Sequence, residues 1–437
     1  MMKLCASLSS VSDIKYIKKA DIAEVRMDFL DHVPDIPDKE ILVTFKKTFD
    51  RSVLPEGFKG MIDVGEEEPP VIDGVEVISS IHDFNQTPST WNIESKLNQM
   101  KGDISKGAYM VRSLSDLKTL HDASKSINKR HILIGMGELG AITRIRGDIL
   151  KNEFTYTYVE EPTAPGQLNL AEMSYLGKDP MVVGILGHPL DKSLSPKMHN
   201  KTMEKLKIKG IYLKFDVEEL EDIEDVITDY NIRGMNVTIP YKTAILEHLD
   251  SVDKDVEAVG AANTIVNKNG TLKGYNTDIK GIKQAMKLGG FDPKGRRALI
   301  MGSGGAARAC AYTLVEKGCR VTVTGRTGKN TRMLCKDLGC DYVPRDNIVL
   351  MQYDLITNCT PVGMYGEEEY PVNISRLSKD HTAFDMVYGI DTPLIKKARE
   401  VGAGIVTGED MLAAQGAASL EMWTGKKDLF KLMRGAL

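Results

Sequence analysis

The stretch Met301–Cys310, MGSGGAARAC, directly follows the apolar residues Ala298–Ile300. A glycine turn between a strand and a helix lets backbone N–H groups approach a pyrophosphate at the helix N-terminus, although such a turn alone also fits an ordinary strand–helix connection. The next predicted strand, Arg320–Thr324, ends in Gly325-Arg326-Thr327. An arginine at this point favours the 2′-phosphate of NADP over the bare ribose of NAD. Together these segments predict a Rossmann-like domain that binds NADP.

The composition is that of an ordinary globular protein, with 42% hydrophobic and 27% charged residues and a net charge of −4 over 437 residues. This charge gives no reason to expect nucleic acid as a partner, and no apolar run approaches the roughly 20 residues of a membrane-spanning helix. The N-terminal residues predict a first strand rather than a signal peptide. The six cysteines show no metal-ligand spacing, so we expect free thiols, no metal and a cytoplasmic location. The sequence carries no signal for an oligomeric state.

The segment Ser174–Pro180 is the weakest stretch for packing and divides the chain into residues 1–175 and 180–437. Eight short apolar runs precede it: Lys3–Leu8, Asp21–Arg26, Ile41–Phe45, Gly60–Val64, Val75–Ser80, Ala108–Val111, His131–Gly135 and Thr155–Val159. Helical patterns follow only some of these runs: Ser12–Ala20, Thr90–Met100, Ser115–Lys129 and Ala141–Lys151. Eight strands with helices between them predict a (β/α)₈ barrel. Prolines between the second and fifth strands oppose helices there, so we expect a trimmed barrel; the alternative is an open α/β sheet.

After residue 180 the strand and helix patterns predict two further α/β parts. Residues 180–282 and 408–437 form a substrate-binding part, to which the last amphipathic helix, Met411–Trp423, returns. Residues 283–407 form the NADP-binding part. Ligands of such sheets bind beyond the carboxyl ends of the strands, in the cleft.

Several segments of the second half carry polar side chains suited to a small polyol. Ser193 and Ser195 precede a helix, Lys242 ends the segment Asn236–Lys242, and Asp278 follows Gly274–Thr277. Taken singly, the serines read as helix caps and the lysine and aspartate as solvated surface residues. Their occurrence together upstream of a nucleotide turn favours a ligand site.

A series of motifs in this half resembles the shikimate dehydrogenases over essentially all of residues 180–437. The motifs, in order, are SLS (193–195), NVTIPYK (236–242), GAANT (260–264), NTD (276–278), GSGGAARA (302–309), GRT (325–327), NCTPVGM (358–364), DMVY (385–388) and AAQGAA (413–418). The resemblance implies that Lys242 and Asp278 are the catalytic pair in reduction of a ketone. It implies a substrate site of Ser193, Ser195, Thr238, Asn263, Asp278, Tyr388 and Gln415. It implies an NADP site of Gly302, Ser303, Gly304, Gly305, Ala306, Gly325, Arg326, Thr327, Gly328, Lys329, Asn330, Met386 and Gly408. The family's turn has Asn where this chain has Gly325.

In the first half, Lys106 and His82 lie at or near predicted strands. Burial can lower the pKa of a lysine and make it a nucleophilic amine, and histidine serves readily as a general base near neutral pH. Taken alone, Lys106 reads as a surface lysine and His82 as a structural residue. Further polar residues fall near strand ends, where barrel enzymes place their sites: Ser7, Glu24, Arg26, Asp28, Arg144, Thr163 and Gln167.

This set resembles type I 3-dehydroquinate dehydratases from residue 3 to about residue 172. The matching motifs are ExRxD (24–28), TFK (44–46), SxHDFxxTP (80–88), DIxK (103–106), TR (143–144) and APGQ (164–167). The resemblance implies that Lys106 forms an imine with the substrate ketone and that His82 removes the neighbouring proton and then protonates the departing hydroxyl. Two positions depart from the family pattern. Lys46 replaces an arginine that could hold a carboxylate with two hydrogen bonds, and Asp50 replaces the glutamate that would orient His82.

Together the two resemblances imply a fused enzyme that dehydrates 3-dehydroquinate to 3-dehydroshikimate and reduces that product to shikimate with NADPH. The partners would then be small-molecule substrates only. Three alternatives stay open: a dehydrogenase whose barrel is an inactive scaffold, a Schiff-base aldolase, and oxidation of quinate rather than shikimate. The His82-Asp83-Phe84 segment opposes the aldolase, and Ser193, Ser195 and Arg326 favour shikimate and NADP.

Overall fold

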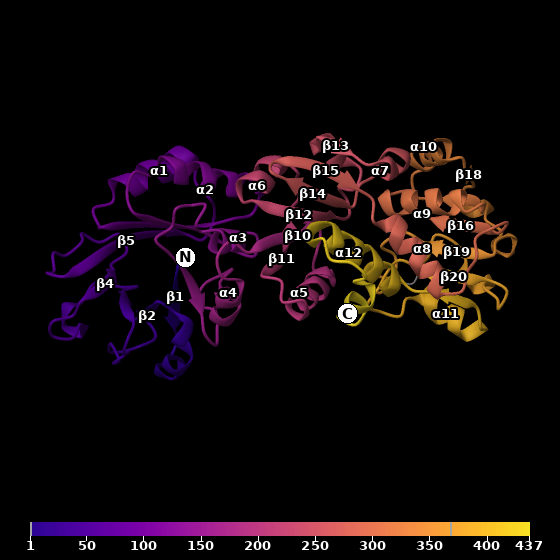
Figure 1. Cartoon of the computed structure of the whole chain (residues 1–437). Coiled ribbons are helices and arrows are strands. Elements are labelled where there is room, and N and C mark those ends of the chain that lie inside the picture. The colour runs from indigo at the N-terminus through magenta and orange to yellow at the C-terminus, as the bar shows by residue number, and fades with distance from the viewer. Residues whose placement is uncertain (1, 368) are drawn as a thin grey trace. The chain divides into compact units, whose positions relative to one another are not determined.

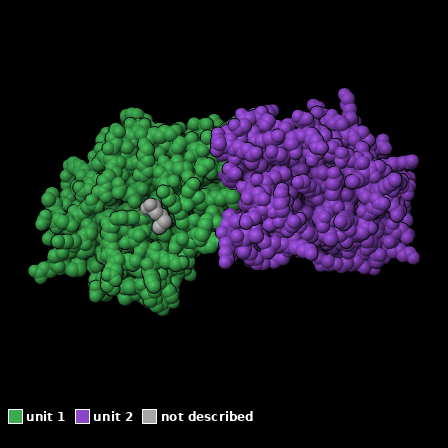
Figure 2. All heavy atoms as spheres, in the orientation of Figure 1, with its two compact units in different colours: residues 1–182, 209–232 green, residues 183–208, 233–437 purple. Residues whose placement is uncertain are grey.

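The computed structural model describes residues 2–367 and 369–437, and Figure 1 shows their helices and strands along the chain. The chain forms two compact units, one of Met1–Val182 with Lys209–Ile232 and one of Val183–Ile208 with Arg233–Leu437 (Figure 2). The described strands form one nine-stranded sheet and two six-stranded sheets. Among the described helices, none is both long and apolar enough to cross a membrane.

The first sheet is curled and parallel, and its order β7-β6-β5-β4-β3-β2-β1-β8-β9 places successive strands side by side. Its strands are β1 (Lys3–Leu8), β2 (Ile22–Arg26), β3 (Glu40–Thr44), β4 (Gly60–Asp63), β5 (Val75–Asp83), β6 (Ile104–Met110), β7 (His131–Met136), β8 (Phe154–Tyr158) and β9 (Leu168–Asn169). The first eight match the predicted strands, and consecutive parallel neighbours are the arrangement of a (β/α)₈ barrel.

The curled sheet is closed between β7 and β8 through Asn152, just before β8. A bridge joins His131 to Asn152, and the Asn152 side chain accepts a hydrogen bond from the Leu133 N–H and donates one to the Leu133 carbonyl, at 2.8 and 2.9 Å. The amide side chain thus replaces a stretch of strand pairing. Beyond this point β8 pairs with the short strand β9 instead of β7.

Helices cover only part of the outside of this sheet, as the prolines predicted. The helices are η1 (Val11–Lys19, a 3₁₀ helix), α1 (Thr90–Gln99), α2 (Leu114–Ser126), α3 (Ala141–Ile145) and α4 (Leu170–Leu176). Between β2 and β5 the only helix in the described part of the chain is the short 3₁₀ helix η2 (Arg51–Val53). Apolar loop side chains such as Phe49, Leu54 and Phe58 pack there on Val43 and Ile62 instead. The prediction of a trimmed barrel is therefore confirmed.

The second sheet has the order β11-β10-β12-β14-β15-β13. Its strands are β10 (Met181–Gly187), β11 (Gly210–Asp216), β12 (Ile232–Val237), β13 (Ser251–Val252), β14 (Thr264–Lys268) and β15 (Thr271–Tyr275). The helices of this part are α5 (Ser195–Lys205), α6 (Ile223–Asp229), η3 (Ala244–His248), α7 (Lys254–Val259), α8 (Asp278–Leu288), α12 (Gly408–Thr424) and α13 (Phe430–Arg434). Helix α12 packs along α8 and contacts α5 and β14, as expected for a C-terminal helix that returns to the substrate-binding part.

The third sheet is parallel, with the order β18-β17-β16-β19-β20-β21. Its strands are β16 (Arg297–Met301), β17 (Arg320–Thr324), β18 (Asp341–Tyr342), β19 (Leu355–Asn358), β20 (Thr382–Asp385) and β21 (Gly404–Val406). The helices between them are α9 (Gly305–Glu316), α10 (Gly328–Leu338), η4 (Arg345–Asn347), η5 (Leu350–Gln352), η6 (Ile374–Arg376) and α11 (Pro393–Val401). Counted along the chain, this is the order 3-2-1-4-5-6 of a dinucleotide-binding domain. The order reverses between β16 and β19, so the turn after Met301 lies at the switch point where such domains bind nucleotides.

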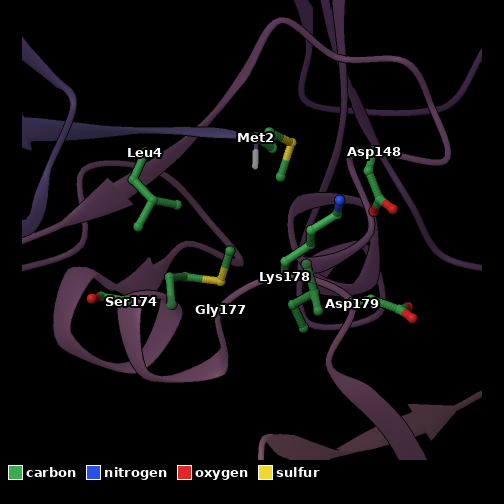
Figure 3. A pocket seen from close by; sticks show the side chains of 9 residues that line it. Met2, Leu4, Asp148, Ser174, Gly177, Lys178 and Asp179 are labelled. Carbon is green, nitrogen blue, oxygen red and sulfur yellow. The ribbon is translucent and has the colours of Figure 1, made fainter.

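A cavity of about 180 Å³ lies at the amino end of β1, where Met2, Leu4, Met173 and Lys178 line it (Figure 3). The residues predicted to be catalytic do not line it. In barrels of this type the amino ends of the strands serve stability and the carboxyl ends carry the chemistry. The candidate site must therefore be sought elsewhere in the sheet.

Candidate active sites

Inside the curled sheet, a layer of apolar side chains is followed by a layer of polar side chains two residues further along the same strands. Residues two apart in a strand face the same side. The apolar layer consists of Cys5, Ile22, Leu42, Met61, Ile78, Ile104 and Phe154. Two residues later in the same strands come Ser7, Glu24, Thr44, Asp63, Ser80, Lys106 and Tyr156, all of them buried. Seven strands therefore deliver one polar group each toward their carboxyl ends.

Lys106 is buried within this layer, with only 4% of its surface exposed. Its Nζ lies 3.0 Å from Asp63 Oδ2 and 4.3 Å from the centre of the Tyr156 ring. Asp63 also accepts hydrogen bonds from the Ser80 hydroxyl, at 2.6 Å, and from the Gly65 N–H, at 3.1 Å. Burial acts to raise the pKa of the Asp63 carboxyl, but the Lys106 ammonium and these hydrogen bonds outweigh it and lower the pKa. Lys106 is thus an enclosed amine with a charged partner rather than a solvated surface group.

His82 lies near the end of β5, two residues beyond Ser80, which pairs with Lys106. Burial, followed by the charges of Lys106 and Lys46, lowers the pKa of His82 from 6.5 to about 3. The imidazole is therefore neutral at physiological pH. A neutral imidazole can accept a proton, as a general base must.

The remaining polar residues of this site form a connected frame around the strand ends. Glu24 accepts hydrogen bonds from the hydroxyls of Ser7 and Thr44. The Gln167 side chain accepts hydrogen bonds from Thr163 and Ala164, while Arg26 pairs with Asp28 and donates to the Thr163 carbonyl at 3.0 Å. The loop after β8 is in this way joined to β1 and β2, because Gln167 also donates to Ser7 at 3.4 Å.

Arg144, in α3, brings a buried positive charge to the same end of the sheet. It donates to the Pro165 carbonyl at 3.3 Å, and its Nε has no hydrogen-bond partner within the described residues. Burial lowers its pKa to about 10, so the guanidinium stays charged at neutral pH. A buried, incompletely satisfied guanidinium suits the carboxylate of a ligand.

The two positions that depart from the family pattern behave differently. Lys46 follows β3. Burial, together with the charge of Lys106, lowers the pKa of Lys46, so its ammonium interacts with the charges of this site. Asp50 is exposed, and its carboxylate accepts hydrogen bonds from the backbone and hydroxyl of Ser52. The structure uses Asp50 to cap η2, and it is the carboxylate of Asp63 that lies beside Lys106.

Sequence reasoning did not single out Asp63 or Tyr156, and Ser80 entered it only as the first residue of the motif SxHDFxxTP (80–88). A signal was available in the spacing, because each of these polar residues follows an interior apolar residue by two positions. The signal becomes visible only when the register of all the strands is compared.

In the second half, Lys242 and Asp278 lie together as predicted. Lys242 Nζ is 2.5 Å from Asp278 Oδ2, and only 4% of the Asp278 side chain is exposed. Asp278 begins α8, and its other oxygen accepts a hydrogen bond from Asn263 Nδ2 at 2.8 Å. Asn263 also accepts a hydrogen bond from the Thr277 N–H at 2.7 Å, so the amide side chain is held at both ends. An ammonium in this position can donate a proton or stabilise negative charge on an oxygen.

The other predicted substrate residues surround this pair in part. The Gln415 side chain lies 3.4 Å from Asn263 Nδ2, and Tyr388 hydrogen-bonds Ser193. Ser195 begins α5 and is buried, with its N–H directed at the Ser193 hydroxyl. Thr238 is half-buried just after β12.

A buried network that the sequence did not reveal supports Asn263. The Ser419 hydroxyl, on α12, lies within 2.8 to 3.2 Å of polar atoms of Asn236, Thr264 and Thr277. These side chains come from β12, from β14, from the residue before α8, and from α12. They join the elements around Lys242 and Asp278, the pair that the sequence predicts to be catalytic.

The glycine turn leaves the space that a dinucleotide needs. Gly302 has a φ of +117°, and α9 begins at Gly305. A Cβ added at Gly304 would meet no atom within 4 Å, so its backbone borders open space, whereas one at Gly305 would lie 2.6 Å from Lys242 Cβ. The turn therefore lies directly against Lys242, and it includes Ser303 and is followed by Ala306 in α9.

The other predicted cofactor residues occupy two further strand ends. Gly325, Arg326 and Thr327 follow β17, and Gly328, Lys329 and Asn330 form the first turn of α10. At Gly325 an added Cβ would lie 2.5 Å from Thr331 Oγ1, so a side chain there would need the Thr331 hydroxyl to move. Met386 follows β20, and Gly408 begins α12 with its Cα against the Val387 carbonyl. These residues fit an NADP site, with a bare backbone at the pyrophosphate turn and an arginine at the end of the second strand.

The curled parallel sheet with its buried Lys106 is typical of lyases that act through a lysine imine. The second half, with a dinucleotide-binding sheet beside Lys242 and Asp278, is typical of a dinucleotide-dependent keto-reductase. The Type I 3-dehydroquinase family matches residues 70–176. The shikimate dehydrogenase substrate binding domain matches residues 185–265, and the shikimate 5′-dehydrogenase C-terminal domain matches residues 408–437.

Individual relatives agree with these matches. A shikimate dehydrogenase (NADP(+)) of Methanococcus maripaludis is 37% identical over 270 residues, which are 59% of this chain and 96% of that protein. The structure of Thermus thermophilus shikimate 5-dehydrogenase with NADP(H) and shikimate is 36% identical over 59% of this chain and 98% of that one, with a TM-score of 0.54. A Corynebacterium glutamicum quinate dehydrogenase with NAD is 29% identical over 59% of this chain and 98% of that one, with a TM-score of 0.55. The chain belongs to the shikimate dehydrogenase family, and its first half carries a type I 3-dehydroquinase domain.

Proposed function

We propose that the chain catalyses two consecutive reactions, dehydration of 3-dehydroquinate to 3-dehydroshikimate and reduction of that product to shikimate with NADPH. The proposal rests above all on the burial of Lys106 against Asp63 and Tyr156, beside the neutral His82. A buried lysine–aspartate pair gives little stability compared with apolar residues of the same size, so an inactive scaffold has no stability reason to keep one. Buried titratable groups that lie together in this way are typical of functional sites.

In the first reaction the amine of Lys106 attacks the substrate ketone, whose oxygen leaves as water, and forms an iminium. The iminium withdraws electrons and acidifies the neighbouring carbon, from which His82 removes a proton. His82 then returns that proton to the departing β-hydroxyl, and water releases the enone from the lysine. Asp63 holds Lys106 in place and balances its charge. Asp50, which the sequence assigned to the orientation of His82, caps η2 instead. Arg144 binds the substrate carboxylate.

In the second reaction Lys242 faces the ketone oxygen and stabilises the charge that grows there, then supplies a proton. Asp278 orients Lys242, and Ser193, Ser195, Thr238, Asn263, Tyr388 and Gln415 bind the hydroxyl and carboxylate groups of the substrate. NADPH, when bound, supplies the hydride, and Gly302–Ala306, Gly325–Asn330, Met386 and Gly408 hold it. Arg326 favours NADP over the NAD that accompanies the quinate dehydrogenase described above, and Ser193 and Ser195 favour shikimate.

The whole proposal predicts that the purified chain oxidises NADPH when 3-dehydroquinate is the only other substrate. Both halves are required for this result, because the ketone that is reduced must first be formed by dehydration. The absorbance of NADPH is followed, with 3-dehydroshikimate supplied in a parallel reaction as a control for the second half. Oxidation with 3-dehydroshikimate but not with 3-dehydroquinate would favour the reading in which the barrel is an inactive scaffold.

We expect replacement of Lys46 to change the pH dependence of dehydration, because His82 must be neutral to act as a base. Replacing Lys46 by methionine removes a positive charge that lowers the pKa of His82, so this pKa rises from about 3 toward 6.5. Protonated histidine cannot act as a base, and the acid limb of kcat/KM for dehydration therefore moves to higher pH. The Lys46→Arg variant keeps the charge and should keep the limb of the wild type. Superimposable acid limbs for Lys46→Met and wild type would contradict this coupling.

A further inference from the structure

The polar layer inside the curled sheet contains a tyrosine hydroxyl without a hydrogen-bond partner. Tyr156, in β8, is buried with 4% of its surface exposed, and its Oη forms no hydrogen bond with any residue of the described chain. A buried polar group without a partner destabilises a fold, because it has lost its hydrogen bonds to water and gained none in return. The presence of this hydroxyl therefore needs an explanation other than the stability of the fold.

The ring of Tyr156 is held in place, so the hydroxyl cannot turn toward a partner elsewhere. Phe154, two residues earlier in the same strand, packs against it with 5.2 Å between the ring centres and 57° between the ring planes. The amine of Lys106 lies over the ring, with Nζ 4.3 Å from its centre, in a cation–π arrangement. The hydroxyl is thus fixed beside the amine that attacks the substrate.

The charges around Tyr156 keep its hydroxyl protonated. Burial, followed by the negative charges of Glu24 and Asp63, raises the pKa of Tyr156 well above 10. Both carboxylates already accept hydrogen bonds from other groups, Glu24 from Ser7 and Thr44, and Asp63 from Lys106, Ser80 and Gly65. Tyr156 therefore brings to the interior a hydrogen-bond donor that these carboxylates do not use.

We propose that Tyr156 is a further catalytic residue of the dehydration, whose hydroxyl donates a hydrogen bond to the ketone oxygen of 3-dehydroquinate while Lys106 attacks the carbonyl carbon. The carbon that bonds to Nζ carries this oxygen, and Nζ itself lies over the ring that carries the hydroxyl. Negative charge grows on the oxygen as the C–N bond forms. A fixed donor in an enclosed site stabilises such charge strongly, because it needs no reorganisation during the reaction.

Tyr156 keeps its own proton in this step. Counted from the ammonium of Lys106, the nitrogen gives up two of its three hydrogens and retains one in the iminium. The ketone oxygen leaves with both of these hydrogens as water, and a C=N double bond replaces the C=O double bond. Transfer of the Tyr156 proton is not needed, and a phenolate buried near Glu24 and Asp63 would be costly.

The inference rests on the proposed dehydration and is tested on the full chain with Tyr156→Phe, which removes the hydroxyl and keeps the ring. Wild type and variant are mixed with 3-dehydroquinate and stopped with acid at successive times. Mass spectrometry of the intact chain then gives the fraction that carries the substrate as an imine. We expect the rate of imine formation to fall about 10- to 100-fold in Tyr156→Phe.

The stability of the same variant separates a catalytic role from a structural one. Because the hydroxyl has no partner in the folded chain, its removal should leave the midpoint of thermal unfolding unchanged or raise it. A hydroxyl that served the fold would lower this midpoint when removed. Reduction of 3-dehydroshikimate, which uses the second half of the chain, should be the same in wild type and variant.

Tyr109→Phe is the matched control. Tyr109 is also buried, with 2% of its surface exposed, and it lies in β6 three residues after Lys106. It packs over Gly107, where an added Cβ would lie 3.0 Å from the Tyr109 hydroxyl oxygen. Side chains alternate along a strand, so Gly107 and Tyr109 face the outside of the sheet and Lys106 the inside. The control should form the imine within twofold of the wild-type rate.

Three results would overturn the inference: imine formation in Tyr156→Phe at the wild-type rate, a lowered unfolding midpoint in that variant, or an equal loss of rate in Tyr109→Phe. Failure of the proposed dehydration gives a different result, since wild type itself would then form no imine. An imine in wild type, combined with an unaffected Tyr156→Phe, would overturn this inference alone.

Discussion

Replacement of Lys106 by alanine is expected to lower the dehydration of 3-dehydroquinate by about 10⁴-fold or more and to leave the reduction of 3-dehydroshikimate unchanged. The reason is that the amine is the group that bonds to the substrate, and no positioning by the other residues replaces an electron-withdrawing iminium. Formation of the enone is followed by its ultraviolet absorbance. Borohydride added with 3-dehydroquinate should attach a stable adduct to wild type, located at Lys106 by peptide mass spectrometry, and none to Lys106→Ala.

The Lys106→Ala variant leaves Asp63 buried without its positive partner, which destabilises a fold. The double variant Lys106→Met/Asp63→Asn removes both charges and separates loss of chemistry from loss of structure. Lys101→Met is the control, because Lys101 is exposed and pairs only with Glu68 among the described residues. An adduct on Lys46, or dehydration that survives in a folded double variant, would refute the assignment of Lys106.

The strands and the trimmed side of the barrel could be predicted because both depend on local signals. Short apolar runs mark buried parallel strands, and prolines oppose a helix everywhere except in its first turn. The predicted helix at Ser12–Ala20 forms instead as the 3₁₀ helix η1, and the one at Ala141–Lys151 ends as an α-helix at Ile145. These differences follow from packing against the sheet, which a pattern of residues does not contain.

Candidate site residues were predictable where they stand in contiguous motifs and not where strand register brings them together. Lys106, His82, Lys242 and Asp278 each lie in a recognisable segment. Asp63 ends a four-residue strand without any motif, and its importance arises from the Lys106 amine on another strand, 43 residues away. Asp50 stood at the family's position in the sequence, but its carboxylate accepts hydrogen bonds from the backbone and hydroxyl of Ser52 and caps η2.

The hydrogen-bonded network around Ser419 in the second half could not be predicted either, because it too depends on contacts between distant parts of the chain. Ser419 lies in an alanine-rich helix whose composition predicts only packing. Its hydroxyl meets Asn236 and Thr277, which are 183 and 142 residues away in the chain. Such contacts form because α12 packs against α8. The amphipathic pattern predicted that this helix packs on the substrate-binding part, but not which residues it contacts.

Replacement of Lys242 by methionine is expected to lower the reduction of 3-dehydroshikimate by about 10³-fold in kcat, with dehydration of 3-dehydroquinate unchanged. Lys242 is the only described lysine that ion-pairs with Asp278, so nothing else can place an ammonium at the ketone oxygen. Asp278→Asn should lower kcat as well, since an amide neither attracts the ammonium nor fixes its direction. NADPH oxidation measures both variants, and near-wild-type turnover in a folded Lys242→Met chain would contradict the mechanism.

The two lysine variants together test whether the halves act independently. Supplied with 3-dehydroquinate and NADPH, Lys242→Met should accumulate 3-dehydroshikimate, and Lys106→Ala should do nothing because it cannot form the ketone that it could reduce. A mixture of the two chains should oxidise NADPH after a lag, since an enone released by one chain can diffuse to the other. An inactive mixture, together with Lys242→Met that releases no 3-dehydroshikimate into solution, would mean that the intermediate does not leave the chain that makes it. The assumption that the two sites exchange the intermediate through solution would then fail.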